Sequence, residues 1–62
     1  MEKPEELKMA DLRGDEFTLD TTLHLNNIKV LCIDGHMFSN IKAVRRIAAK
    51  LNQIADWMEQ KS

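Results

Sequence analysis

The stretch EFTLDTTLHLNNIKVLCIDGHMF, residues 16–38, decides the fold. Its first ten residues alternate between apolar and polar side chains, which is the period of a half-buried β-strand. The pair Asn26–Asn27 tolerates positive φ and therefore predicts a two-residue hairpin turn into a second strand over 28–33. With a two-residue turn, Leu23 lies opposite Val30, so the apolar faces of the two strands come into register.

A second turn signal, Asp34-Gly35, predicts that residues 36–38 fold back as a short third strand. The two faces of the resulting antiparallel meander differ in their apolar content. One face is expected to carry Phe17, Leu19, Leu23, Leu25, Ile28, Val30 and Met37. The opposite face is expected to carry Leu31, Ile33 and Phe38, among Thr22, His24 and Lys29.

Residues 39–60 predict one long amphipathic helix, which Ser39 is placed to cap by accepting hydrogen bonds from backbone N–H groups. Apolar side chains recur at alternating spacings of three and four residues, which is the a/d pattern of a helix with one buried stripe. These positions are Ile41, Val44, Ala48, Leu51, Ala55 and Met58. Ile47, Ile54 and Trp57 widen the stripe beyond what a three-stranded sheet covers.

The first 14 residues predict a short helical arm, because Pro4 suits the first helical position and Gly14 supplies a left-handed stop. The arm has few apolar side chains, so we expect it to dock on the rest of the chain or to fray. These segments together predict an α+β fold in a single domain, residues 1–62. In this fold a small antiparallel β-meander over 16–38, with two long strands and a short third, packs against the long C-terminal helix.

The composition restricts the class of protein. Nine Lys and Arg residues face ten Asp and Glu residues, for a net charge of −1, and the pI is about 6.0. A generic polybasic nucleic-acid binder, with a pI above about 9, is therefore excluded. The lone Cys32 permits no internal disulfide, and the opening residues lack the apolar stretch of a signal peptide. We expect a cytoplasmic protein with no membrane partner.

The predicted apolar surface exceeds what one copy can bury, since a single helix covers only one face of the sheet. The residues left uncovered, and expected to serve a dimer or partner interface, are Leu31, Ile33, Phe38, Ile54 and Trp57. We therefore expect a homodimer or a higher homo-oligomer, formed by sheet-face pairing, by strand-edge pairing or by docking of the helix on its twin. The alternative is that the N-terminal arm folds over Leu31 and Phe38 and closes the monomer.

The predicted helix carries a basic stripe, Lys42, Arg46 and Lys50, with Arg45 to the other side. Like charges four residues apart are mildly unfavourable, and cations near the start of a helix oppose its macrodipole. Local helix stability therefore does not explain the arrangement, which suits contact with an acidic protein surface, a phosphate backbone or an anionic ligand. The alternative is a solvated face without a partner.

No catalytic, metal-binding or cofactor-binding constellation is expected. Cys32 and His24 are predicted on opposite faces of the sheet, so they do not converge as metal ligands or as a nucleophile and base. The two glycines lie far apart, which excludes a glycine-rich phosphate loop. We therefore expect no enzyme activity, no metal and no cofactor.

A further pattern joins the second turn to the helix: the strand VLCIDG (Val30–Gly35), then Ser39, then a helix with Arg46, Ala49 and the a/d stripe. This pattern resembles strand–Asp-Gly–Ser/Thr–helix proteins that are common among very short phage and mobile-element reading frames. The resemblance covers residues 28–58 and implies a compact, usually oligomeric binder of a host protein, sometimes one that blocks defence. No site residue is carried over from it.

These features together predict a non-enzymatic, homodimeric protein-interaction module, in the form of a phage-type inhibitor that binds and blocks a host protein. Its partners are expected to be a second copy and a protein with an acidic surface. A nucleic-acid-binding regulator that uses the basic stripe is the alternative. A sequestering protein for a small anionic ligand, such as a nucleotide, is a further alternative.

Overall fold

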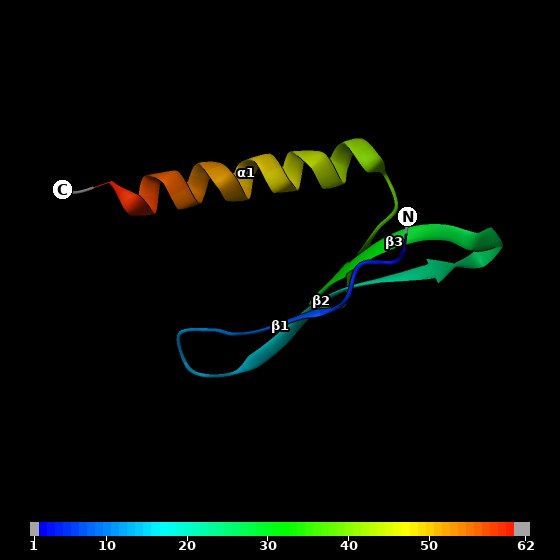
Figure 1. Cartoon of the computed structure of the whole chain (residues 1–62), viewed down its shortest axis with the longest axis horizontal. Coiled ribbons are helices and arrows are strands. Elements are labelled where there is room, and N and C mark those ends of the chain that lie inside the picture. The colour runs from blue at the N-terminus through cyan, green and yellow to red at the C-terminus, as the bar shows by residue number, and fades with distance from the viewer. Residues whose placement is uncertain (1, 61–62) are drawn as a thin grey trace.

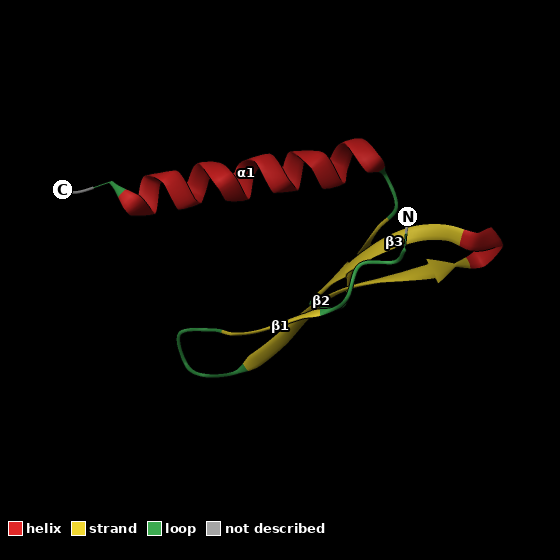
Figure 2. Cartoon of the chain, viewed as in Figure 1, coloured by secondary structure: helices red, strands yellow, loops and turns green. Residues whose placement is uncertain are grey.

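The computed structural model describes residues 2–60 and shows an α+β fold (Figure 1 and Figure 2). Four strands form one antiparallel sheet, and a long helix follows them. The elements are β1 (Leu7–Ala10), β2 (Glu16–His24), the 3-10 turn η1 (Leu25–Asn27), β3 (Ile28–Ile33), β4 (His36–Phe38) and α1 (Ile41–Glu59). The predicted fold class, a small antiparallel meander followed by one long C-terminal helix, is confirmed.

β1 takes the place of the expected N-terminal helical arm, so that prediction is wrong; Met1, which it included, lies outside the described residues. Leu7 pairs with Leu19 and Met9 pairs with Phe17, which makes β1 an edge strand beside β2. The edge of β2 offers a row of backbone hydrogen-bonding groups that a short strand can satisfy. An isolated helix of similar length is marginal in water, so pairing with the sheet is the more stable outcome.

Local geometry fixes two of the hairpin turns. Asp34–Gly35 is confirmed as the turn between β3 and β4, because both residues have positive φ, 46° and 81°, as a type I′ turn requires. In the turn between β1 and β2, Asp11 Oδ1 accepts hydrogen bonds from the N–H groups of Arg13 (2.8 Å) and Asp15 (2.9 Å). Gly14 completes that turn with a φ of 86°.

The turn between β2 and β3 has three residues rather than two, and it shifts the strand pairing by one residue. Both members of Asn26–Asn27 adopt positive φ, as expected, but Leu25 belongs to the turn as well. Leu23 therefore lies opposite Lys29 and not opposite Val30. A one-residue shift moves every side chain of a strand to the other face, so the expected division of residues between the two faces is wrong.

The observed register gathers most of the large apolar side chains on one side of the sheet, which we call the apolar face. It carries Leu7, Met9, Phe17, Leu19, Leu23, Leu31, Ile33 and Phe38. The opposite face is mixed: it carries Ile28, Val30 and Met37 together with polar side chains such as Thr22 and Asp20. Val30, which is 5% exposed, is the one buried hydrophobic side chain among residues 2–60.

α1 begins after Asn40, whose side chain accepts hydrogen bonds from the backbone N–H groups of Lys42 (2.9 Å) and Ala43 (3.2 Å). Asn40 thus provides the cap that was expected from Ser39. A cap of this kind satisfies two N–H groups that have no partner inside the helix. The predicted long helix is confirmed, and it runs without a break to Glu59.

α1 leaves most of the sheet uncovered. Ala43, Val44 and Ile47, in its first turns, are half-buried, whereas every described residue from 48 to 60 is exposed. Figure 1 shows the helix extending away from β3 and β4 toward the end of the molecule where the β1–β2 turn lies. The expectation that the helix packs over the sheet is therefore wrong within one copy.

One copy is consequently open in shape. Its accessible surface is 6242 Å², against about 4,100 Å² for a compact protein of this mass. Its radius of gyration is 13.9 Å, against about 10.6 Å for a compact chain of this length. Each copy thus exposes about 2,100 Å² more than a compact monomer would.

Candidate functional site

α1 presents an apolar arc that is exposed along most of its length. The arc consists of the a/d positions Ile41, Val44, Ala48, Leu51, Ala55 and Met58, together with Ile47 and Ile54. Ile41 and Met58 are each 70% exposed, and Leu51 is 54% exposed. A continuous exposed apolar row on a small protein marks an interaction surface.

Two of the predicted interface residues, Ile54 and Trp57, lie on this helix and are 41% and 70% exposed. Trp57 follows Lys50 by seven residues, two helical turns, and so lies on the same side of α1 as the basic stripe. Its indole ring therefore lies at the border between the apolar arc and the cations. Tryptophan is one of the residue types enriched in the energetically dominant parts of protein interfaces.

The other three predicted interface residues, Leu31, Ile33 and Phe38, are half-buried on the apolar face of the sheet. They do not form a separate open face, because the three-residue turn places them beside the apolar residues of β2. Phe38 lies next to the start of α1, where it lines a shallow groove. The groove also includes Ala43, Arg46, Ile47, Lys50 and Gln53. The structure thus brings Phe38 together with two of the predicted cations.

The basic stripe is exposed along its whole length, and Arg45 is exposed as well. Lys50 Nζ donates to the side-chain oxygen of Gln53 at 3.4 Å. Within the described part of the chain, the one ion pair joins Lys8 to Glu6 at 3.8 Å. The cations of α1 therefore have no carboxylate partner among residues 2–60 of their own copy.

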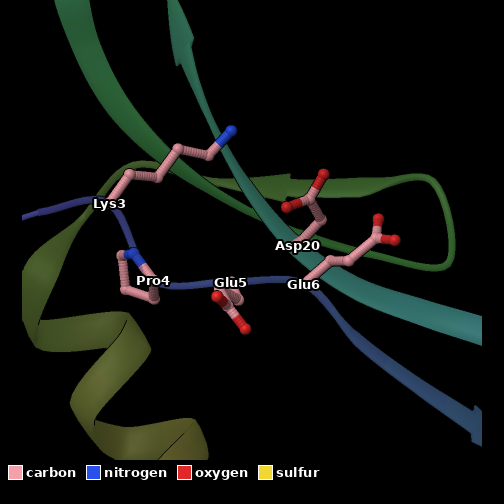
Figure 3. A pocket seen from close by; sticks show the side chains of 5 residues that line it. All are labelled: Lys3, Pro4, Glu5, Glu6 and Asp20. Carbon is pink, nitrogen blue, oxygen red and sulfur yellow. The ribbon is translucent and has the colours of Figure 1, made fainter.

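The N-terminal region is acidic where α1 is basic. Residues 2–20 hold seven carboxylates and three cations, a net charge of −4, whereas residues 41–51 hold four cations and no carboxylate. Figure 3 shows part of the acidic region, where Glu6, Asp20 and Lys3 point to one side of the N-terminal segment around a shallow surface pocket. One copy therefore combines an acidic N-terminal region, residues 2–20, with a basic first half of α1.

The sequence argument against a metal site places Cys32 and His24 on opposite faces of the sheet, and that placement is wrong. Cys32 and His24 lie on the same face of the sheet, not on opposite faces, since Cys32 pairs with Asp20 and His24 pairs with Ile28. They are nevertheless four residues apart along the strands, which is about 13 Å. Among residues 2–60, no three His, Cys, Asp or Glu side chains are grouped in a way that could hold a metal ion.

Sequence reasoning missed the contribution of β1 to the apolar face. Leu7 and Met9 lie on that face opposite Leu19 and Phe17, and Leu7 remains exposed. The signal that could have shown this is the alternation of Leu7 and Met9 with Lys8 and a small alanine over residues 7–10.

The chain matches no protein-family model, no curated protein and no solved structure. Among residues 2–60, no helix combines the length and the apolar character needed to cross a membrane. The function is therefore inferred from the surface of the molecule itself.

Proposed function

We propose that the chain is a non-enzymatic protein-interaction module that works as a homodimer. The observation that carries this proposal is the surplus of about 2,100 Å² of exposed surface in one copy. Two copies that each buried this surplus would share an interface of about 4,200 Å² in total, which is in the range of obligate dimers. A chain of 62 residues with so small a core has few other sources of stability.

The second part of the proposal is contact with a protein that has an acidic surface. Lys42, Arg46 and Lys50 provide an exposed row of positive charge, and Trp57 provides an apolar anchor on the same side of α1. Charges of one sign on one helix face accelerate association with a surface of opposite sign and select against other partners. Arg45 adds a fourth exposed cation toward the other side of the helix.

The narrower form of the proposal is an inhibitor that binds and blocks a host protein in the cytoplasm. The support for this form is the resemblance to short phage and mobile-element proteins. Such an inhibitor needs no catalytic group, because covering the working surface of its target is sufficient. An interface of standard size, about 800 Å² per partner, would be enough for this purpose.

A nucleic-acid-binding regulator is the second candidate, because the basic stripe borders the groove at Phe38 and could follow a phosphate backbone. The net charge of −1 supplies no general attraction for nucleic acid. Salt separates the two candidates. Affinity for nucleic acid falls steeply and linearly with the logarithm of the salt concentration, in proportion to the number of phosphate contacts.

The experiment measures molar mass first and partner binding second. The wild type should sediment as a dimer at micromolar concentration, and a mass near 7.2 kDa would contradict the homodimer. An immobilised chain is then exposed to host lysate and, separately, to DNA and RNA at low and high salt. The double variant Arg46→Glu/Lys50→Glu is compared with the matched control Lys3→Glu/Arg13→Glu, in which both cations are exposed and neither belongs to α1.

We expect the wild type and the control to capture the same acidic protein from the lysate in repeated experiments, and the stripe variant to fail to capture it. Equal retention by both variants would contradict the role of the basic stripe. If the wild type binds nucleic acid in a salt-sensitive manner and only the stripe variant loses this binding, the nucleic-acid-binding regulator replaces the protein-interaction module as the proposed function.

A further inference from the structure

We infer that α1 pairs in antiparallel orientation with α1 of a second copy, and this inference rests on the homodimer proposed above. The a/d positions would form the seam between the two helices. A two-fold axis beside Asn52 overlaps residues 45–59 of the two helices, and 15 residues at 1.5 Å each give a seam about 22 Å long. Leu51 and Met58 in that seam are both more than half exposed in one copy.

The two flanks of the seam differ in chemistry. In heptad terms, the g positions that flank it on one side are Ile47 and Ile54. The e positions that flank it on the other side are Arg45, Asn52 and Glu59. One flank is therefore apolar and the other is polar, with a cation at its start and a carboxylate at its end.

The apolar flank is the one that turns toward the sheet. Ile47 is half-buried and lines the same groove as Phe38, which belongs to the apolar face of the sheet. Arg45, on the polar flank, is exposed. Two helices that lie side by side on one layer of sheet must both turn their apolar flanks toward that layer.

Antiparallel pairing meets this condition, whereas parallel pairing does not. When two helices run in opposite directions, like flanks meet, so the g positions adjoin each other on the sheet side and the e positions adjoin each other on the solvent side. When they run in the same direction, the e flank of one adjoins the g flank of the other. Arg45 and Glu59 would then lie beside isoleucines.

Charge complementarity selects the same orientation. Along the polar flank the chain runs from Arg45 through Asn52 to Glu59. When this flank meets the same flank of a second helix that runs in the opposite direction, Arg45 of each copy lies near Glu59 of the other, on both sides of the two-fold axis. The charge order also opposes the dipole of a single α1, with cations early and carboxylates late. In an antiparallel pair, each cationic half lies beside the negative end of the other dipole.

The test uses sedimentation equilibrium of the full chain at low ionic strength, where charge contacts are least screened. Arg45→Glu places two carboxylates on each side of the axis, and Glu59→Arg places two cations there. Each variant alone should raise the dimer Kd roughly tenfold through two lost attractions and two new repulsions. An equimolar mixture of the two variants should restore the wild-type affinity, because opposite charges then meet at both contacts.

The matched controls are Lys42→Glu and Asp56→Arg, which make the same charge changes at positions that point away from the seam. Neither control should change the Kd by more than about twofold. Circular dichroism confirms that each variant retains its helix.

The outcomes separate the orientation from the dimer. A dimeric wild type whose seam variants behave like the controls overturns the antiparallel pair and leaves the homodimer standing. A mixture that fails to recover the affinity likewise overturns the antiparallel pair alone. A wild type that is monomeric at micromolar concentration overturns both proposals.

Discussion

Leu51 provides the sharpest measure of how much stability the exposed face of α1 contributes to self-association. The substitution Leu51→Ala removes an apolar side chain near the middle of the proposed seam. Burying a whole leucine side chain contributes about 1.5–3 kcal/mol, and Leu51 is still 54% exposed in one copy. Burial of that remaining part on association is therefore worth about 1–1.5 kcal/mol per copy. A symmetric dimer contains two such residues, so the expected loss is about 2–3 kcal/mol, or roughly 30- to 150-fold in Kd.

The helix itself should tolerate this change, because alanine has the highest intrinsic helix propensity. Sedimentation equilibrium over a dilution series measures the Kd, and the helical signal in circular dichroism of the dissociated variant shows that α1 persists. Gln53→Ala is the matched control, since Gln53 lies on the polar side of the same helix and is exposed. If Leu51→Ala and Gln53→Ala give the same Kd as the wild type, the apolar arc does not form the contact between copies.

Three further predictions concern local structure and are measured by urea unfolding at one fixed protein concentration. Gly35→Ala should cost about 1–2 kcal/mol through its φ of +81° alone, because an added Cβ meets no atom of the described residues within 4 Å; an unchanged midpoint would contradict this. Thr21→Val should stabilise by about 1 kcal/mol, because the Thr21 hydroxyl is buried and has no hydrogen-bond partner among residues 2–60; a loss of stability would show that the hydroxyl gains a partner on assembly. Asn40→Ala should cost about 1 kcal/mol by removing the cap of α1, whereas Asn40→Asp should retain it; equal stability of these two variants would exclude a capping role.

Much of the fold could be predicted because several signals are local. The helix follows from an apolar period that no glycine or proline interrupts, and its end lies within one residue of the predicted position. Asp34–Gly35 determined its turn because a type I′ geometry needs two residues that accept positive φ. These features depend on neighbours along the chain, which the sequence contains in full.

The register between β2 and β3 could not be predicted, because neither the turn nor the strand decides it. Asn26–Asn27 accepts positive φ in a two-residue or a three-residue turn alike. The strand β3 is apolar on both faces, with Val30 on one and Leu31 on the other, so either register places hydrophobic side chains against those of β2. Register is well specified only where one face of each strand is clearly polar.

The N-terminal region was misinterpreted for a different reason. Pro4 and the acidic residues after it resemble a helix start, yet four residues, Leu7–Ala10, are enough to form a strand when a neighbouring edge is available. The partner strand begins six residues beyond the end of β1, at Glu16. A tertiary contact therefore overrode a weak local preference.

The register shift and the open helix together account for the position of the unused apolar surface. Either register leaves large apolar side chains on both faces of the sheet, because the mixed face of the observed sheet still carries Ile28, Val30 and Met37. The observed register concentrates eight others on the apolar face, so this is the face that gains most from cover by helices. The a/d stripe of α1, in which Leu51 and Met58 are more than half exposed in one copy, then becomes the proposed seam with a second copy.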